Sequence, residues 1–98
     1  MQYDNCGQGN LHGYARYSVM RDALNMTGRP IVYTFEPFVQ PSLWPKSVGN
    51  ALRTGSDIRP GYGKCLQVAE TANKWAHTTG PGTWADADIL EVGNKGLS

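Results

Sequence analysis

The sequence is short of charge and has no long apolar run, and each shortage excludes a class of protein. Charged residues make up only 17% of the 98, and the formal net charge is +1, so no basic surface for nucleic acid is predicted. No apolar run approaches the ~18 residues that a membrane span needs, and no secretory signal sequence is visible at the start. We therefore expect neither nucleic acid nor a membrane as a partner.

Cysteine and histidine are equally scarce. Cys6 and Cys65 are too few for a disulfide framework, and His12 and His77 do not stand at metal-ligand spacing from either of them. The strings "GQG" and "GYGKC" lack the remainder of any phosphate-binding fingerprint. We therefore expect no metal ion and no cofactor.

The residues that are present predict one small globular domain over 1–98, since 40% of them are hydrophobic. Apolar spacing near 3.6 and the position of Gly28 predict a helix over 13–26. The other expected elements are a strand end at 1–4, a strand at 31–35, a short helix over 47–52, a strand around 52–56, a helix over 61–80 and a strand end within 83–90. This alternation predicts an α/β fold of parallel strands joined by crossover helices.

Acidic residues follow the predicted strands at their C-terminal ends, where parallel folds place their functional groups. They are Asp4, Glu36, Asp57, Asp86 and Asp88. Four successive acidic strand ends predict a carboxylate-rich pocket on one face. Paired carboxylates serve glycoside hydrolysis, in which one attacks or activates water and the other protonates the leaving oxygen.

Other polar and aromatic residues fit the same chemistry. Arg53 precedes Asp57 by four residues and can hold a sugar hydroxyl or a neighbouring carboxylate. Trp44 and Trp84 can offer ring faces to a sugar, whereas Trp75 lies on a predicted helix and is expected in the core.

Each acidic residue also has a purely structural interpretation. Asp4 fits a turn or a cap, Glu36 with Pro37 fits an extended loop, and Asp57 fits the cap of the following helix. Only their shared placement at successive strand ends favours the pocket.

Longer strings are more specific. "YDNC", "TGRPI", "SVGNALRTGSDI", "NKWA" and "GPG.W.D.DILEVGN.G" together resemble the α-galactosidases of glycoside hydrolase family 27, and the likeness runs from Tyr3 to Ser98. The resemblance implies a (β/α)8 barrel followed by a β-sandwich, of which this chain would supply roughly strands four to seven, a partial TIM barrel. It implies a retaining enzyme that removes terminal α-galactosyl residues from galactose-containing oligosaccharides or glycoconjugates.

The same resemblance assigns roles to residues. Asp4 would be the nucleophile and Asp57 the general acid/base, with their carboxyl groups about 5–5.5 Å apart. The residues expected to bind substrate are Arg53, Glu36, Trp84, Asp86 and Asp88. Cys6 resembles a family cysteine whose disulfide partner lies upstream of this chain. Asn25 opens the glycosylation sequon "NMT", which fits the secreted, lysosomal or vacuolar location of the family.

The sequence departs from the family pattern at several positions. Gln2 replaces a lysine that contacts substrate, a loss of about 1.5–3 kcal/mol for a charged hydrogen bond. "FEP" replaces "CEW", Leu52 replaces a tryptophan, and "WADAD" replaces "WNDPD". These changes suggest an altered pocket lining and leave N-acetylgalactosamine or β-L-arabinopyranose open as the sugar.

Two further alternatives also stay open: a non-catalytic carbohydrate-binding or structural remnant, and an unrelated small α/β binding domain. A full barrel needs roughly 200–250 residues. We therefore expect the isolated chain to be inactive or nearly so, unless self-association or a partner chain completes the barrel.

Overall fold

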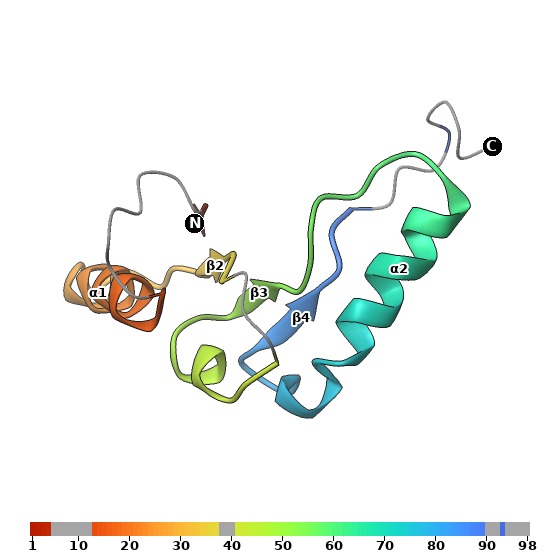
Figure 1. The fold of residues 1–98 in the computed structure, drawn as a ribbon. Coiled ribbons are helices and arrows are strands. Elements are labelled where there is room, and N and C mark those ends of the chain that lie inside the picture. Colours follow the sequence, from red (N-terminus) through yellow and green to blue (C-terminus); the bar gives the residue numbers. More distant parts are fainter. Residues whose placement is uncertain (5–12, 38–40, 90–92, 94–98) are drawn as a thin grey trace.

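The computed structural model describes residues 1–4, 13–37, 41–89 and 93. These residues form a four-stranded sheet in the order β1-β2-β3-β4, and all its neighbouring strands are parallel. The strands are β1 (Gln2–Tyr3), β2 (Thr34–Phe35), β3 (Ala51–Arg53) and β4 (Trp84–Asp86). Helix α1 (Gly13–Met26) joins β1 to β2 along the chain, and α2 (Tyr62–Asn73) comes after β3 and before β4 in the sequence, although β3 and β4 are neighbours in the sheet (Figure 1). The expected α/β fold of parallel strands is confirmed.

Helix α1 has the bounds that the sequence predicts. Gly28 follows it with a φ of +70°, a left-handed conformation in which glycine avoids the clash that a Cβ atom would cause. The second helix is shorter than expected, because α2 ends at Asn73 and a separate 3-10 helix, η2 (Ala76–Thr78), follows it. Trp75 lies between the two and is 1% exposed, so its expected core position is confirmed.

The short helix expected over 47–52 is wrong. A 3-10 helix, η1 (Trp44–Ser47), comes earlier, where Pro45 supplies a backbone angle suited to a first helical turn. Asn50 then binds the chain to Tyr33, the residue just before β2: its Oδ1 accepts a hydrogen bond from Tyr33 N at 2.9 Å, and its own N–H donates to Tyr33 O at 2.7 Å. These bonds begin the ladder that makes the next residues a strand.

Alternation along the strands separates two faces of the sheet. Tyr3, Phe35, Leu52 and Ala85 share one register row and pack into or against the core. That core consists of Tyr17, Tyr33, Phe35, Val48, Leu52 and Trp75. The residues before and after each row member therefore lie on the other face, which we call the open face.

In the described part of the chain, no helix is both long and apolar enough to cross a bilayer.

Gly49 has a packing reason to be glycine. A Cβ atom there would lie 2.8 Å from Phe35 Cε1 and 2.9 Å from Tyr33 O, so the side chain and backbone of two core residues would have to move. We expect Gly49→Ala to lower the free energy of unfolding by about 1–3 kcal/mol. Urea unfolding followed by tryptophan fluorescence measures this.

Gly63→Ala is the matched control for that substitution. Gly63 lies in α2, and a Cβ atom added to it would meet nothing within 4 Å, so alanine should leave stability unchanged or raise it by up to about 1 kcal/mol. Equal effects of the two substitutions would contradict the packing argument.

Candidate active site

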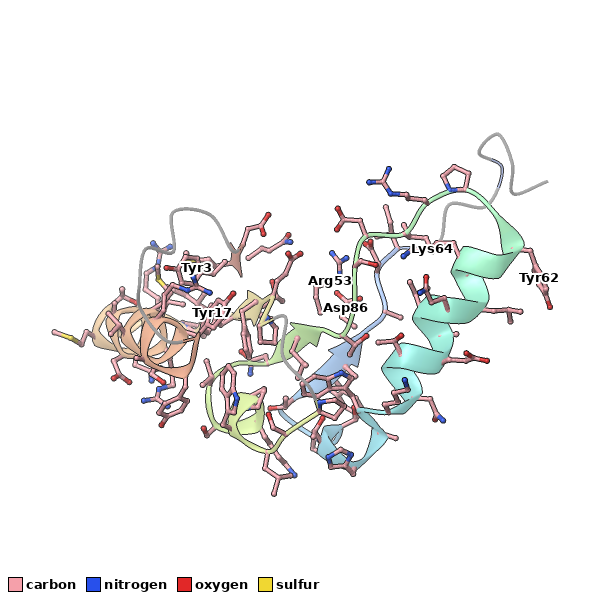
Figure 2. The ribbon with its side chains drawn as sticks, in the orientation of Figure 1. Tyr3, Tyr17, Arg53, Tyr62, Lys64 and Asp86 are labelled. Atoms are coloured by element: carbon pink, nitrogen blue, oxygen red, sulfur yellow. The ribbon has the colours of Figure 1, made fainter. Side chains whose placement is uncertain are left out.

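The C-terminal ends of the four strands lie at one edge of the sheet because the strands are parallel. Arg53 and Asp86, the last residues of β3 and β4, are register partners and lie next to each other (Figure 2). Asp4 and Glu36 each follow directly on the last residue of β1 and β2. The open face therefore brings together the strand-end residues that the sequence singles out.

Arg53 is the centre of this group. Its Nη1 donates to Glu36 Oε1 at 3.0 Å, and its Nη2 donates to Asp57 Oδ1 at 3.1 Å and to Asp88 Oδ2 at 3.0 Å. The Arg53 side chain is 12% exposed, whereas that of Asp57 is 75% exposed. One guanidinium thus holds carboxylates from three segments, and only Asp57 extends well into solvent.

Asp4 joins the group through Glu36. Burial raises the pKa of Glu36 above its usual range, and a side-chain hydrogen bond with Asp4 raises it further, while the Arg53 charge opposes the shift. The negative charges of Asp4 and Asp57 also act to raise it. Asp4 and Asp57 therefore both act on Glu36, although their mutual separation of about 5–5.5 Å stays a prediction.

Asp86 and Asp88 form the turn after β4. Asp88 has a φ of +89°, a left-handed conformation that costs a non-glycine residue on the order of 1 kcal/mol. Asp86 Oδ1 accepts a hydrogen bond from Asp88 N at 2.9 Å, which stabilises the turn. Burial pushes the pKa of Asp88 upward, but hydrogen bonds from the Ile58 and Ile89 N–H groups and the Arg53 charge outweigh it, so the pKa lies below its usual range.

Tyr17 supports the group from behind, a role that its helical spacing alone did not suggest. Its hydroxyl donates to the backbone oxygen of Glu36. Its ring packs edge-on against the ring of Tyr3, with 5.3 Å between the ring centroids (Figure 2). Tyr3 directly precedes Asp4 in the chain. The buried core thus contacts the segments that carry both Asp4 and Glu36.

Two other expected site residues lie apart from Arg53. Trp84 is on the open face, two residues before Asp86 in β4, and is 54% exposed. Asn25 is exposed near the end of α1 and does not belong to the cluster of carboxylates around Arg53. Cys6 lies outside the described residues, and Cys65 is a half-buried free thiol.

The expectation of an altered pocket lining is wrong for two of the departures. Phe35 and Leu52 are both 0% exposed and belong to the core, on the helix side of the sheet. Ala85 packs against the same core. Of the strand residues that depart from the family pattern, Gln2 is the one that alternation places on the open face. Three of these four strand substitutions, at Phe35, Leu52 and Ala85, therefore change the core rather than the surface that would meet a sugar.

No cluster of three or more histidine, cysteine, aspartate or glutamate side chains suited to a metal ion occurs among the described residues. The carboxylates around Arg53 are instead neutralised in part by its guanidinium. The group offers what paired-carboxylate chemistry needs: an exposed acid, further carboxylates, and a cation that limits their repulsion.

Comparison with known proteins gives one consistent result. The alpha-galactosidase A family matches the chain over residues 1–98. All of the chain aligns at 44% identity with alpha-galactosidase 3 of Arabidopsis thaliana and at 39% with the alpha-galactosidase of Cyamopsis tetragonoloba. A probable alpha-galactosidase D of Aspergillus fumigatus is 34% identical over 96% of the chain.

The chain spans 23%, 24% and 17% of the lengths of these three relatives. The four parallel strands agree with part of a (β/α)8 barrel, and the family matches every residue of the chain. The chain therefore belongs to the alpha-galactosidase A family of glycoside hydrolases.

Proposed function

We propose that this chain carries the catalytic carboxylates of a retaining α-galactosidase that removes terminal α-D-galactosyl residues. The observation that supports this most is the Arg53 group, in which Glu36, Asp57 and Asp88 meet one guanidinium and Asp4 is joined through Glu36. The family match and the relatives' names agree with it. A galactose-containing oligosaccharide or glycoconjugate is the proposed substrate.

The proposed reaction has two displacements. In the first, a carboxylate oxygen of Asp4 bonds to the anomeric carbon while the glycosidic bond breaks, and the leaving oxygen takes a proton from Asp57. In the second, Asp57 takes a proton from water, whose oxygen bonds to the anomeric carbon as the bond to Asp4 breaks. Two inversions give net retention. The 75% exposure of the Asp57 side chain suits a group that must meet both a leaving group and water.

The remaining open-face residues are proposed to hold the sugar. Arg53 and Glu36 would bind hydroxyl groups near the anomeric carbon. Asp86 would accept a hydrogen bond from a sugar hydroxyl with the carboxylate oxygen that does not bind Asp88 N. Trp84 would cover an apolar face of the ring, since much of its side chain is exposed. These roles rest on the shared face and on the resemblance.

Full activity is proposed to need further strands. In the described sheet, β1 and β4 are edge strands, whereas a closed barrel has none. The missing strands would come from a longer polypeptide, from a second copy or from a partner chain. Residues 1–98 would then act as one part of a catalytic barrel.

Asn25 is proposed as a glycan acceptor if the protein passes through the secretory pathway, as a secreted or vacuolar enzyme would. Asn25 and Thr27 of the sequon are both exposed at the end of α1. Production in a eukaryotic secretory host should then give a mass that falls on treatment with an N-glycanase. The Asn25→Gln variant should show no such change.

Catalytic roles for Asp4 and Asp57 predict separable defects. We expect Asp4→Asn to abolish hydrolysis of nitrophenyl α-galactoside. We expect Asp57→Asn to slow the hydrolysis of a substrate with a poor leaving group more than that of nitrophenyl α-galactoside, because a poor leaving group depends on protonation by the general acid, which contributes about 10²–10⁴-fold. The assays use the 98-residue chain and, in parallel, Arabidopsis alpha-galactosidase 3 carrying this chain in place of its matching segment. The control is Asp22→Asn, since Asp22 pairs with Arg21 at the exposed surface, away from Arg53.

Turnover that survives Asp4→Asn in either protein would refute the nucleophile assignment. Sugar binding without turnover, detected by calorimetry with galactose, would favour a non-catalytic carbohydrate-binding remnant. Comparison of galactoside, N-acetylgalactosaminide and arabinoside substrates identifies the sugar.

Arg53 is predicted to stabilise the fold in a pH-dependent way. Arg53→Met leaves Glu36 and Asp88 partly buried without their cation and should lower the free energy of unfolding by about 3 kcal/mol at pH 7. Arg53 favours the ionised form of both carboxyl groups, so its contribution is lost as pH falls through their folded pKa values. The folded pKa lies above the usual range for Glu36 and below it for Asp88, so the Glu36 part is lost first. Urea unfolding at pH 7 and pH 3 measures the difference.

The control for Arg53 is Arg21→Met, which removes an exposed ion pair with Asp22 and an exposed hydrogen bond to Ser47 O, and it should cost about 1 kcal/mol or less at either pH. An Arg53→Met loss that is the same at pH 7 and pH 3 would mean that packing, not charge, accounts for the effect.

A further inference from the structure

We propose that Asp88 is a positioning residue that latches the loop carrying Asp57 to the end of β4, rather than a residue that contacts sugar. This inference rests on the proposed function for its catalytic consequence. The latch itself is a structural claim about residues 53–58 and 86–89, which can be tested without turnover.

A single oxygen of Asp88 binds one residue before Asp57 in the chain and one residue after it. Oδ2 accepts from Arg53 Nη2 at 3.0 Å and from Ile58 N at 2.9 Å. Arg53 Nη2 also donates to Asp57 Oδ1 at 3.1 Å. The loop between β3 and α2 is therefore tied to the β4 end at the residue directly after Asp57 and at the cation that Asp57 binds.

The carboxylate of Asp88 is itself held in place. Its Oδ1 accepts from Ile89 N at 2.8 Å, so three N–H donors fix its two oxygens. Its side chain is 15% exposed, whereas that of Asp57 is 75% exposed. Asp88 is thus shielded from solvent and engaged with protein donors, while Asp57 is the carboxylate with access to a ligand.

The backbone at Asp88 is arranged to make this contact. It is the one non-glycine residue with a left-handed φ in the described parts of the chain. Asp86 secures the turn twice, through Oδ1 with Asp88 N and through its backbone oxygen, which accepts from Thr54 N at 3.0 Å. In Figure 2, Arg53 and Asp86 lie where these two chain segments meet.

The first experiment measures hydrogen exchange at single amides by NMR in the 98-residue chain. We expect Asp88→Asn to speed exchange at Ile58 N–H by about ten- to a hundredfold, the effect of losing one charged hydrogen bond, and to leave Val68 in α2 unchanged. Asp22→Asn is the matched control and should change neither amide. Unchanged exchange at Ile58 would overturn the proposal, and so would equal acceleration at Ile58 and Val68.

A second variant separates the carboxylate from its unusual backbone. Asp88→Gly removes the carboxylate but suits the left-handed φ, so it should fold and still lose protection at Ile58. Normal protection in this variant would mean that the turn, not the side chain, holds the loop. In the unmodified chain the Ile58 amide resonance should also titrate with Asp88, below the usual aspartate range. No titration there would contradict the Ile58–Asp88 contact.

The catalytic arm compares two leaving groups in the protein that shows activity. An alkoxide needs protonation by Asp57 more than a nitrophenolate does. Asp88→Asn should therefore lower kcat for methyl α-galactoside about tenfold more than for nitrophenyl α-galactoside, with little change in KM. Equal losses with a raised KM would instead indicate sugar contact. Absence of turnover in the unmodified proteins would count against the proposed function, while the exchange data would still decide the latch.

Discussion

The contact between the Arg53 guanidinium and three carboxylates is the interaction on which the strand-end group depends. Glu36, Asp57 and Asp88 come from three separate segments, and each lies within 3.1 Å of a guanidinium nitrogen. Two like charges about 4 Å apart repel by about 4 kcal/mol near a protein surface. Without the cation these segments would separate or take up protons. A planar guanidinium with several donors suits this role better than a lysine ammonium.

The sheet register places that cation on the correct face. Leu52 and Phe35 point into the core, so Arg53 and Glu36, each one residue further on, lie on the open face. A shift of one residue in the pairing would bury Arg53 and expose Leu52. The apolar core behind the strands is therefore what determines where the charges meet. Tyr17 joins the two layers, because it is fully buried and its hydroxyl reaches the backbone oxygen of Glu36.

Sequence patterns predict the parts of this arrangement that depend on local periodicity. The bounds of α1, the core position of Trp75 and the strand-end placement of Asp4, Glu36 and Asp86 all follow from spacing and residue type. The early end of α2 does not, and neither do the bounds of β3, which is a strand at Ala51–Arg53 where one was expected around 52–56, because Trp75 and Asn50 act through contacts with residues distant in sequence. Sequence patterns do not predict that three carboxylates share Arg53, for the same reason. Of the three, only Asp57 is close to Arg53 in the sequence, four residues after it. The sequence departures at Phe35 and Leu52 predict a change of the pocket, but the sheet register places both side chains in the core.

Glu36 and Asp88 bind the same cation, but their pKa values shift in opposite directions. Both bind Arg53 at 3.0 Å, yet the pKa of Glu36 is raised and that of Asp88 is lowered. The difference comes from their other neighbours, because Glu36 is buried beside the Asp4 carboxyl whereas Asp88 accepts two backbone N–H donors. Asp88 therefore stays ionised to a lower pH than a free aspartate, as a fixed anchor should. Glu36 takes up a proton more readily than a free glutamate, so these two carboxyl groups on the same guanidinium lose their charge at different pH: Glu36 first and Asp88 last.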